Sequence, residues 1–383
     1  MKVTESILWT GVHDHAIDLF EGQYRVPKGM SYNSYVILDT RPAVLDTADA
    51  RFAGEWLGKV EAALDGREPE YLIIQHVEPD HSGSILSFME KYPKVTVAAT
   101  PKAFPMLKNF YGLEPENRLE VKADTVLSLG THTLRFVPAP MVHWPEVTLT
   151  YDETEKVLFS ADAFGKFGAW DTPEPWEDEA RRYYIGIVGK FGGPVQALLK
   201  KAAALEIAAI CPLHGPVLQG DLSYYLKLYD IWSSYRVESD GVVIAYTSVY
   251  GNTKKAAELL AAKLEARGVN VTITDLLRDD MAEAVEAAFR YGALVLASTT
   301  YNAGVFPAMR EFIEHLTDRG FRSRTVALME NGSWAPMAAK VMKGLLEGCK
   351  DIAWAETTVR IQSALNAESE QQLEALADEL CGA

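Results

Sequence analysis

The last part of the chain alternates short apolar runs with longer amphipathic runs. Residues 242–246 predict a buried strand, and residues 254–267 predict a helix that stops at Gly268. The pattern repeats, with strand-like runs at 269–274, 293–298, 324–329 and about 352–360 and helical runs at 281–290, 307–318, 336–347 and 367–381. Five such βα units predict a doubly wound, five-stranded parallel sheet that binds ligands at the carboxyl ends of its strands.

The first 240 residues mix strands and helices without this regular repeat. The pattern predicts strands at 35–38, 43–45, 71–75 and 95–97 and helices at 52–64 and 82–89. The pattern changes near 236–241, and 383 residues exceed one ordinary compact core. We therefore predict two α/β domains, 1–240 and 241–383.

Four apolar runs in the first domain each lead to a residue that can bind a metal ion. They are 71–75 before His76, 134–137 before His143, 157–161 before Asp162 and 207–213 before His214. Any one of these residues alone is more often a turn residue or a structural histidine. Four such strand ends together predict a shared site.

Residues 76–81 read His-Val-Glu-Pro-Asp-His, the densest group of potential ligands in the chain. A strand that continues through this segment would place His76 and Glu78 on one side, because side chains alternate along a strand. Asp80 and His81, on the turn that follows, would then face a second ion. The segment predicts a metal site.

The candidate ligands comprise imidazoles and carboxylates but no thiolate: His76, Glu78, Asp80, His81, His143, Asp162 and His214. They are too many for one tetrahedral zinc ion and suit two ions that share a bridging carboxylate. Asp162, which is separate from the 76–81 segment, is the natural bridge. Oxygen donors beside imidazoles favour iron or manganese.

Charge and composition narrow the possible partners. The net charge of -16 argues against nucleic acid, which is bound by clustered Lys and Arg. Three scattered cysteines argue against a disulfide framework and against a cysteine-ligated iron–sulfur or rubredoxin-type centre. The N-terminus lacks a signal-like segment and no apolar run approaches membrane-spanning length, so we expect a soluble cytoplasmic protein.

The loop 247–253 has the composition of a phosphate site. It reads Thr-Ser-Val-Tyr-Gly-Asn-Thr and precedes a helix whose first backbone N–H groups are free to bind an anion. It lacks the lysine of NTPase loops and the G-x-G-x-x-G pattern, so a monophosphate fits better than ATP or a dinucleotide. Two later loops, 298–304 and 330–334, carry Tyr301 and Trp334, between which a planar ring is expected.

Residues 241–383 resemble flavodoxin, on the hydroxyl-rich loop that ends in Gly-Asn-Thr and on the two ring-side loops. The resemblance implies FMN, with its phosphate on Thr247, Ser248, Asn252 and Thr253 and its isoalloxazine against Tyr301, Asn302 and Trp334. Thr299 departs from the family, in which proline is frequent at this position. The full expected set is Thr247, Ser248, Val249, Tyr250, Gly251, Asn252, Thr253, Thr300, Tyr301, Asn302, Ala303, Gly304, Asn331, Gly332, Ser333 and Trp334.

The first domain resembles the metallo-β-lactamase fold family, an αββα sandwich. Hydrolases of that family usually read H-x-H-x-D-H, whereas Glu78 occupies the third position here. Together with the flavodoxin-like half, this glutamate makes the chain resemble the flavodiiron proteins, whose pattern is H-x-E-x-D-H followed by a distant His, Asp and His. The resemblance implies one iron on His76, Glu78 and His143, a second on Asp80, His81 and His214, and Asp162 between them.

The resemblance also implies an activity and its partners. We expect reduction of O2 to water, of NO to N2O, or both, at two iron ions per chain that are supplied with electrons through FMN. An external donor is expected, and the family suggests rubredoxin. The family further implies a head-to-tail homodimer or a dimer of dimers, in which the flavin of one protomer faces the irons of the other.

Two other interpretations stay open. A zinc hydrolase of the lactamase type with an appended flavin module would hold two zinc ions. A flavodoxin-like electron carrier with an inert N-terminal scaffold would bind FMN but no stoichiometric metal. We interpret Tyr183 and Tyr184 as core residues rather than hydrogen-bond donors to the site, and Trp144 and Pro145 as residues that shape the loop after His143. The remaining histidines, which we interpret as surface or structural, are His13, His15, His132 and His315.

Overall fold

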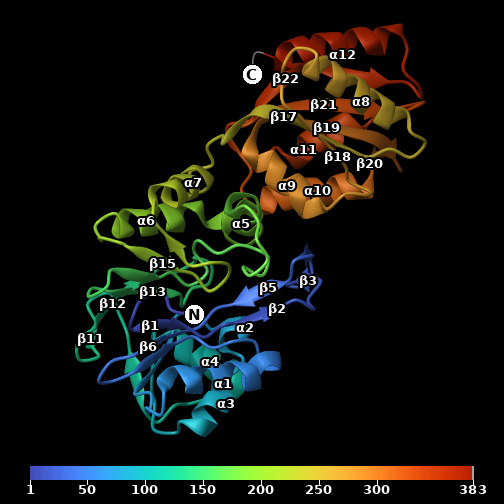
Figure 1. Ribbon diagram of the computed structural model, residues 1–383. Coiled ribbons are helices and arrows are strands. Elements are labelled where there is room, and N and C mark those ends of the chain that lie inside the picture. The colour runs from blue at the N-terminus through green and yellow to red at the C-terminus, as the bar shows by residue number, and fades with distance from the viewer. Residues whose placement is uncertain (382–383) are drawn as a thin grey trace. The chain divides into compact units, whose positions relative to one another are not determined.

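The computed structural model describes residues 1–381, which fold as two compact units that divide between Asp230 and Ile231 (Figure 1). The division falls inside helix α7 (Ser223–Ser233), ten residues before the boundary expected at 240. The first strand of the second unit, β17 (Ser239–Tyr246), contains that expected boundary. No helix among the described residues is both long enough and apolar enough to cross a membrane.

The first unit contains two large mixed sheets. The first has the strand order β1-β6-β7-β8-β9-β10, formed by Ile7–Trp9, Tyr35–Ile37, Ala43–Leu45, Tyr71–Ile74, Thr96–Ala99 and Arg118–Glu120. The second has the order β11-β12-β13-β14-β15-β16, formed by Val126–Ser128, Thr133–Pro138, Thr148–Asp152, Val157–Phe159, Ala209–Cys211 and Leu218–Gln219. Two small two-stranded antiparallel sheets pair β2 (Val12–Asp14) with β5 (Met30–Tyr32) and β3 (Leu19–Phe20) with β4 (Tyr24–Arg25).

One apolar core lies between these sheets. Tyr35 and Ile73 of the first sheet pack with Phe136 and Phe159 of the second, and all four side chains are buried. The helices of this unit are α1 (Ala53–Leu64), α2 (Pro79–Ser82), α3 (Ile85–Lys91), α4 (Ala103–Tyr111), α5 (Trp176–Tyr183), α6 (Gly192–Ala202) and α7. Figure 1 shows α1, α3 and α4 beside the first sheet and α6 beside the second. This arrangement confirms the predicted metallo-β-lactamase-like sandwich.

The segment 76–81 differs from the prediction. Strand β8 ends at Ile74, because the backbone amides of Gln75 and His76 donate to the Asp46 carboxylate, at 2.8 and 3.3 Å, and leave the ladder. Pro79 then begins α2, a position that proline favours because it has no N–H group to satisfy. His76 and Glu78 therefore lie beyond the strand, and Asp80 lies on a short helix rather than on a turn.

The second unit has the strand order β18-β17-β19-β21-β22, and these five described strands are parallel. Its elements are β17, α8 (Asn252–Glu265), β18 (Val271–Asp275), α9 (Met281–Arg290), β19 (Tyr291–Tyr301), β20 (Gly304–Val305), α10 (Pro307–Asp318), β21 (Thr325–Asn331), α11 (Ala338–Leu345), β22 (Ala353–Ile361) and α12 (Ala367–Leu380). The short β20 pairs with the end of β19. This topology confirms the predicted flavodoxin-like, doubly wound sheet.

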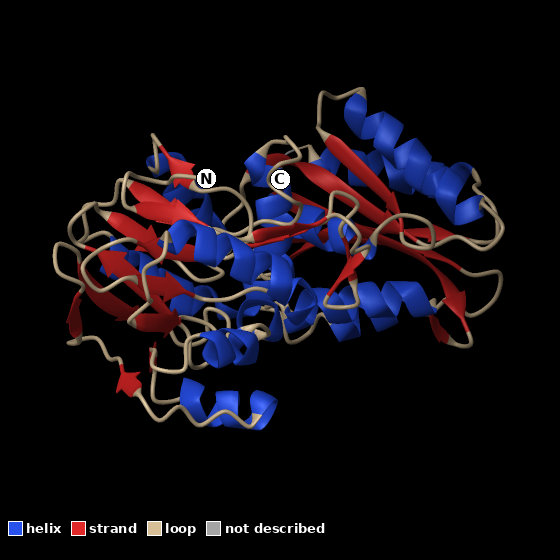
Figure 2. Cartoon of the chain, turned by 60° about the horizontal axis from the view of Figure 1, so that its bottom comes forward, coloured by secondary structure: helices blue, strands red, loops and turns tan. Residues whose placement is uncertain are grey.

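Helices cover both faces of this sheet (Figure 2). Leu260 of α8 and Leu376 of α12 share a buried core with Val295 of β19. The sheet order reverses direction between β17 and β19, and in such sheets a crevice opens at the carboxyl ends of the strands on either side of the reversal. Two of the loops predicted to bind FMN lie at the ends of β17 and β19, and the third lies at the end of the neighbouring β21.

Candidate functional site

Four of the predicted metal ligands form one buried group in the first unit, which we call the first cluster: His76, Glu78, His143 and Asp162. Glu78 Oε2 lies 3.1 Å from Nε2 of both His76 and His143. The two imidazole Nε2 atoms are 3.3 Å apart, and His143 Nε2 is 2.9 Å from Asp162 Oδ2. These four side chains meet from three different loops.

The other three predicted ligands form the second cluster: Asp80, His81 and His214. The Nε2 atoms of His81 and His214 are 3.0 Å apart, and each lies 3.3 Å from Asp80 Oδ2. Asp80 and His81 come from α2, whereas His214 follows β15. The second cluster thus depends on contacts between segments more than 130 residues apart in the sequence.

Asp162 lies between the two clusters. Its Oδ2 atom faces the first cluster, and its Oδ1 atom is 3.2 Å from His81 Nε2 and 4.0 Å from His214 Nε2. A carboxylate with one oxygen on each side is the geometry of a bridging ligand. Tertiary contacts therefore bring together all seven predicted ligands.

The donor atoms fit a pair of metal ions. Metal–nitrogen and metal–oxygen bonds of about 2.0–2.2 Å place neighbouring ligand atoms on one ion roughly 3 Å apart. The separations within both clusters are close to this value. Both carboxylate oxygens of Asp80 are buried and have no hydrogen-bond partner among residues 1–381, which is costly unless a cation binds them.

Burial and charge act in opposite directions on these groups. Burial by itself would lower the pKa of His76, but Asp162, Glu146 and Glu78 raise that pKa well above its usual range. Burial would raise the pKa of Asp162, but His76 and His81 lower it well below its usual range. The buried carboxylates therefore favour positive charge between them, as a cation site requires.

Two residues that the sequence analysis did not identify orient the histidines. His76 Nδ1 donates to Glu146 Oε1 at 2.7 Å, and His214 Nδ1 donates to the carbonyl oxygen of Ser31 at 2.8 Å. These hydrogen bonds leave the Nε2 atoms free to face the clusters. Glu146 follows His143 by only three residues, so its position in the same loop was an available signal. For the Ser31 carbonyl the sequence offered no signal.

Aromatic side chains pack against both clusters. The rings of Phe20 and Tyr183 lie 5.3 and 5.5 Å from the His214 ring, and the Trp144 ring lies 5.1 Å from the His76 ring. Tyr183 and Tyr184 are fully buried, in agreement with their interpretation as core residues. Tyr183 is also an immediate neighbour of the second cluster.

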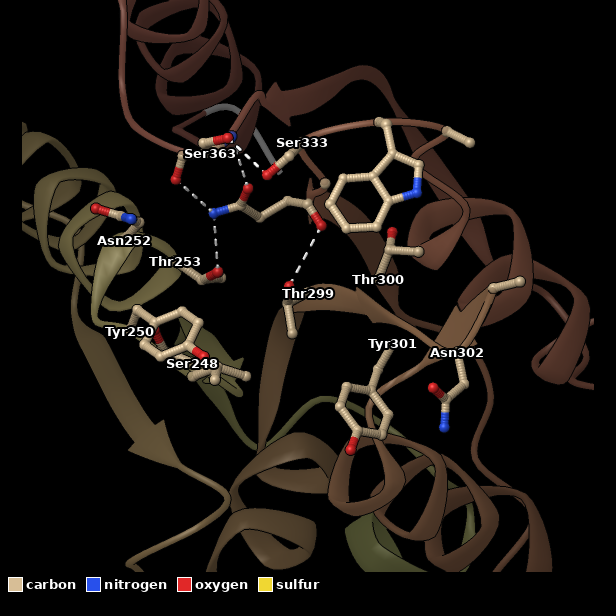
Figure 3. Close-up of a pocket in the computed structure, with 16 residues that line it drawn as sticks. Ser248, Tyr250, Asn252, Thr253, Thr299, Thr300, Tyr301, Asn302, Ser333 and Ser363 are labelled. Atoms are coloured by element: carbon tan, nitrogen blue, oxygen red, sulfur yellow. Dashed lines mark hydrogen bonds between the residues drawn. The ribbon is translucent and has the colours of Figure 1, made fainter.

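The second unit contains a pocket of 510 Å³ at the carboxyl ends of its strands (Figure 3). This volume lies within the range of small-molecule and cofactor sites, about 300–1,000 Å³. Expected FMN contacts that line it are Ser248, Val249, Tyr250, Asn252, Thr253, Thr300, Tyr301, Asn302, Ala303, Asn331, Gly332, Ser333 and Trp334. One pocket therefore joins the predicted phosphate loop to both ring-side loops.

Three expected contacts are absent from the pocket lining. The Thr247 side chain is buried and its hydroxyl pairs with Ser298 Oγ at 2.9 Å. Gly251 precedes α8 with a positive φ of 85°, which glycine adopts readily, and Gly304 pairs with Tyr301 in the β19–β20 turn. The roles of these three residues are in the shape of the loops that hold the lining side chains.

Three other residues line the pocket: Thr299, Ala335 and Ser363. Ser363 lies two positions after β22, at the same edge of the sheet as the predicted loops, so the rule of strand ends could have identified it. Its N–H donates to Asn331 Oδ1 at 3.1 Å and its hydroxyl pairs with Ser333 Oγ at 2.7 Å. Figure 3 shows this network at the edge of the pocket.

The pocket suits a phosphorylated aromatic ring. The N-terminus of α8 and the hydroxyl of Thr253 offer donors at one end, where a phosphate gains from the helix dipole. Tyr250 and Trp334 line the pocket and leave 91% and 83% of their surfaces exposed, so both rings are accessible to a planar ligand. The lining residues therefore fit FMN.

Comparison with known proteins gives matches in both units. Residues 30–215 match the ODP family of beta lactamases, and residues 243–353 match a flavodoxin domain. A nitric oxide reductase from Moorella thermoacetica is 29% identical over 362 residues, which cover 91% of this chain and 90% of the relative.

Solved structures agree along the whole chain. The flavodiiron protein from Giardia intestinalis superposes with a TM-score of 0.92 at 28% identity, covering 99% of this chain and 95% of the other. Rubredoxin oxygen:oxidoreductase from Desulfovibrio gigas shares the fold with a TM-score of 0.93 at 24% identity, covering 100% and 98% of the two chains. With both units, the paired donor clusters and the pocket in place, this chain belongs to the flavodiiron protein family.

Proposed function

We propose that the protein is an oxidoreductase that reduces O2 to water, NO to N2O, or both. The observation that carries this proposal is the combination, in one chain, of two donor clusters joined by Asp162 and a pocket suited to FMN. The first reaction consumes four electrons and four protons per O2. The second consumes two electrons and two protons per pair of NO molecules and releases one water.

Two iron ions in the clusters would supply electrons to the diatomic substrate, and FMN would return them from an external donor. One iron is assigned to His76, Glu78 and His143 and the other to Asp80, His81 and His214. Asp162, with one oxygen facing each cluster, would be the ligand that the two ions share. The rings of Phe20 and Tyr183 pack against the His214 imidazole, and the Trp144 ring packs against the His76 imidazole.

The flavin contacts follow from the pocket lining. The phosphate is assigned to the α8 N-terminus with Ser248, Asn252 and Thr253, and the ring to the loops that carry Tyr301 and Trp334. The full set proposed for FMN remains the sixteen residues named from the sequence, with Thr247, Gly251 and Gly304 acting through loop shape. Ser363 and Thr299 are added to it.

The assembly and the donor belong to the same proposal. Electron transfer requires the flavin to lie close to the irons, so we propose a head-to-tail homodimer or a dimer of dimers. The electron donor is an external protein such as rubredoxin, and the protein is proposed to act in the cytoplasm. Sedimentation of the holoprotein would measure the assembly, and a monomer at micromolar concentration would contradict it.

The decisive experiment is anaerobic purification followed by iron and flavin analysis and by electrode measurement of O2 and NO consumption with a common reductant. We expect two iron ions and one FMN per chain and consumption of one or both gases. Two zinc ions with thioester or ester hydrolysis would instead identify the hydrolase. Bound FMN without stoichiometric metal would identify the electron carrier, in which Asp162→Ala would change nothing.

A further inference from the structure

The two metal-binding clusters differ in what surrounds them. His76, in the first cluster, donates its Nδ1 proton to a carboxylate, Glu146, at 2.7 Å, and both side chains are almost completely buried. In the second cluster, His214 donates to a neutral carbonyl oxygen, and Nδ1 of His81 has no hydrogen-bond partner within the described residues. The two imidazoles whose Nδ1 is hydrogen-bonded therefore differ: His76 in the first cluster has a charged acceptor, and His214 in the second has a neutral one.

A carboxylate behind a metal-binding imidazole has two effects. It fixes the tautomer and the orientation of the ring, and it makes Nε2 a stronger donor because negative charge is pushed toward the metal. Glu146 is itself held in place, since its Oε1 also accepts from the Val77 amide at 3.1 Å. The His76 imidazole is thus set in its binding orientation before an ion arrives.

Charge and geometry also favour tighter cation binding in the first cluster. Besides the shared Asp162, each cluster has one carboxylate ligand, Glu78 or Asp80, and only in the first cluster is a further carboxylate, Glu146, hydrogen-bonded to a ligand imidazole. Asp162 also approaches the first cluster more closely, with 2.9 Å to His143 Nε2 against 3.2 Å to His81 Nε2. A divalent cation therefore gains more electrostatic free energy in the first cluster.

We propose that the clusters fill in order: the first cluster binds its metal ion before the second and more tightly, and Glu146 is the positioning residue that sets this difference. The inference rests on the metal site of the proposed function and adds to it an order of assembly. Metal loading would thus pass through a form with one ion, which is bound by His76, Glu78, His143 and Asp162 of the first cluster.

The test uses the full-length chain, stripped with a chelator and titrated with Co²⁺ against a chromophoric competitor. The competitor reports the two stepwise dissociation constants, and the single-ligand variants described below assign each constant to a cluster. We expect two dissociation constants at least about tenfold apart. Glu146→Gln, which keeps the shape but removes the charge, should weaken the tighter constant by about 10–100-fold, the usual cost of losing such a partner.

Glu330→Gln is the control. Glu330 is also a buried carboxylate, which accepts from the Ala339 amide at 3.0 Å, but it lies in the second unit and in none of the groups of side chains that could hold a metal ion. It should leave both constants unchanged. Equal constants in the unmodified chain, or an unchanged tighter constant in Glu146→Gln, would overturn the inference.

Single-ligand variants provide a second route if Glu146→Gln does not fold. His214→Ala should keep the tighter ion and lose the weaker one, whereas His143→Ala should do the reverse. The opposite result would overturn the order of loading. Binding of fewer than two ions by the unmodified chain would contradict the metal site of the proposed function itself, whereas two ions of equal affinity would contradict only the order.

Discussion

At the scale of single residues, Asp162 has the most connected position in the first unit. Its two oxygens face different clusters, and the side chain is buried. Loss of this carboxylate would remove a ligand from both sites. It would also remove the negative charge that lies between the two cations, so that the cations would repel each other more strongly. Among the described residues, Asp162 alone places one carboxylate oxygen toward each cluster.

Asp162→Asn should therefore lose metal from both sites. We expect iron to fall below one ion per chain and gas consumption to fall by at least about a hundredfold, which exceeds the 10–100-fold typical of outer partners. Metal analysis and electrode assays measure the two effects. FMN content serves as the internal control, and a variant that retained two irons would contradict the bridging role.

Thr253 is the residue that best tests the phosphate end of the flavin pocket. It lies in the first turn of α8, its side chain is buried, and its hydroxyl accepts from Asn331 Nδ2 at 3.4 Å (Figure 3). Thr253→Val preserves the shape but removes one hydrogen bond to a charged group. We expect FMN to bind about tenfold more weakly, which corresponds to about 1.4 kcal/mol.

Fluorescence titration of the apoflavoprotein with FMN measures this effect. Thr317→Val, on α10 and away from the pocket lining, is the matched control and should bind FMN as the unmodified chain does. Equal affinity in Thr253→Val would place the phosphate elsewhere.

At the scale of elements, the buried side chain of Arg324 connects the start of the second unit to two of its elements through hydrogen bonds. The Arg324 guanidinium, just before β21, donates to the carbonyl oxygens of Tyr235, Arg236 and Phe289. Burial lowers the pKa of Arg324 to about 10. These bonds hold the segment that precedes β17 against the ends of α9 and β21.

Arg324→Met should remove the donors and leave several carbonyl oxygens without partners. We expect the free energy of unfolding of the second unit to fall by about 2–4 kcal/mol, since each buried group left unsatisfied costs about 1–3 kcal/mol. Thermal release of FMN fluorescence measures it. The exposed Arg310→Met on the same unit should change stability by less than about 0.5 kcal/mol, and an equal effect in both variants would contradict the role of Arg324.

A buried pair joins two strands of the first unit. His132, just before β12, lies 3.0 Å from Asp152 at the end of β13. The hydrogen bond to Asp152 raises the pKa of His132, and Glu155 and Asp39 add to the effect while burial opposes it. This pair explains why His132, one of the histidines outside the metal pattern, is buried and structural.

The raised pKa gives a signed pH dependence. The pair contributes its full stability below the unfolded value of about 6.5, and the contribution is lost as the pH rises through the higher folded pKa. His132→Gln should therefore destabilise the first unit more at pH 6 than at pH 9 in urea unfolding. In an Asp152→Asn background, His132→Gln should cost the same stability at both pH values. An equal loss at pH 6 and pH 9 when Asp152 is present would contradict the assignment.

At the scale of the whole molecule, the metal-binding residues and the flavin pocket belong to different compact units. Metal ions that bind only the folded first unit stabilise that unit by mass action. They also offset the repulsion among Glu78, Asp80 and Asp162, which are close together and mostly buried.

Removal of the metal should therefore lower one unfolding transition only. In differential scanning calorimetry of the holoprotein, chelation should shift the transition of the first unit to lower temperature and leave the transition that releases flavin in place. Readdition of Fe²⁺ under anaerobic conditions should restore the first transition. A shift of both transitions by the same amount would show that the units do not unfold independently.

The sequence by itself determined much of this protein. Alternating apolar runs predicted the parallel sheet of the second unit, because the side-chain periods of strands and helices are set by local geometry. Strand ends predicted four members of the two clusters, and the ligand-rich segment 76–81 predicted the other three. The hydroxyl-rich loop before α8 predicted one end of the flavin pocket, because its donors and the helix N-terminus are both encoded locally.

Tertiary structure decided what depends on contacts between distant segments. Only folding divides the seven ligands into two clusters, turns one oxygen of Asp162 toward each, and brings Glu146 behind His76. Only folding shows that Asp46 draws the backbone at His76 out of the sheet and that Ser363 joins the pocket. Such contacts join residues from about 30 to more than 130 positions apart, and no periodicity within a short window records them.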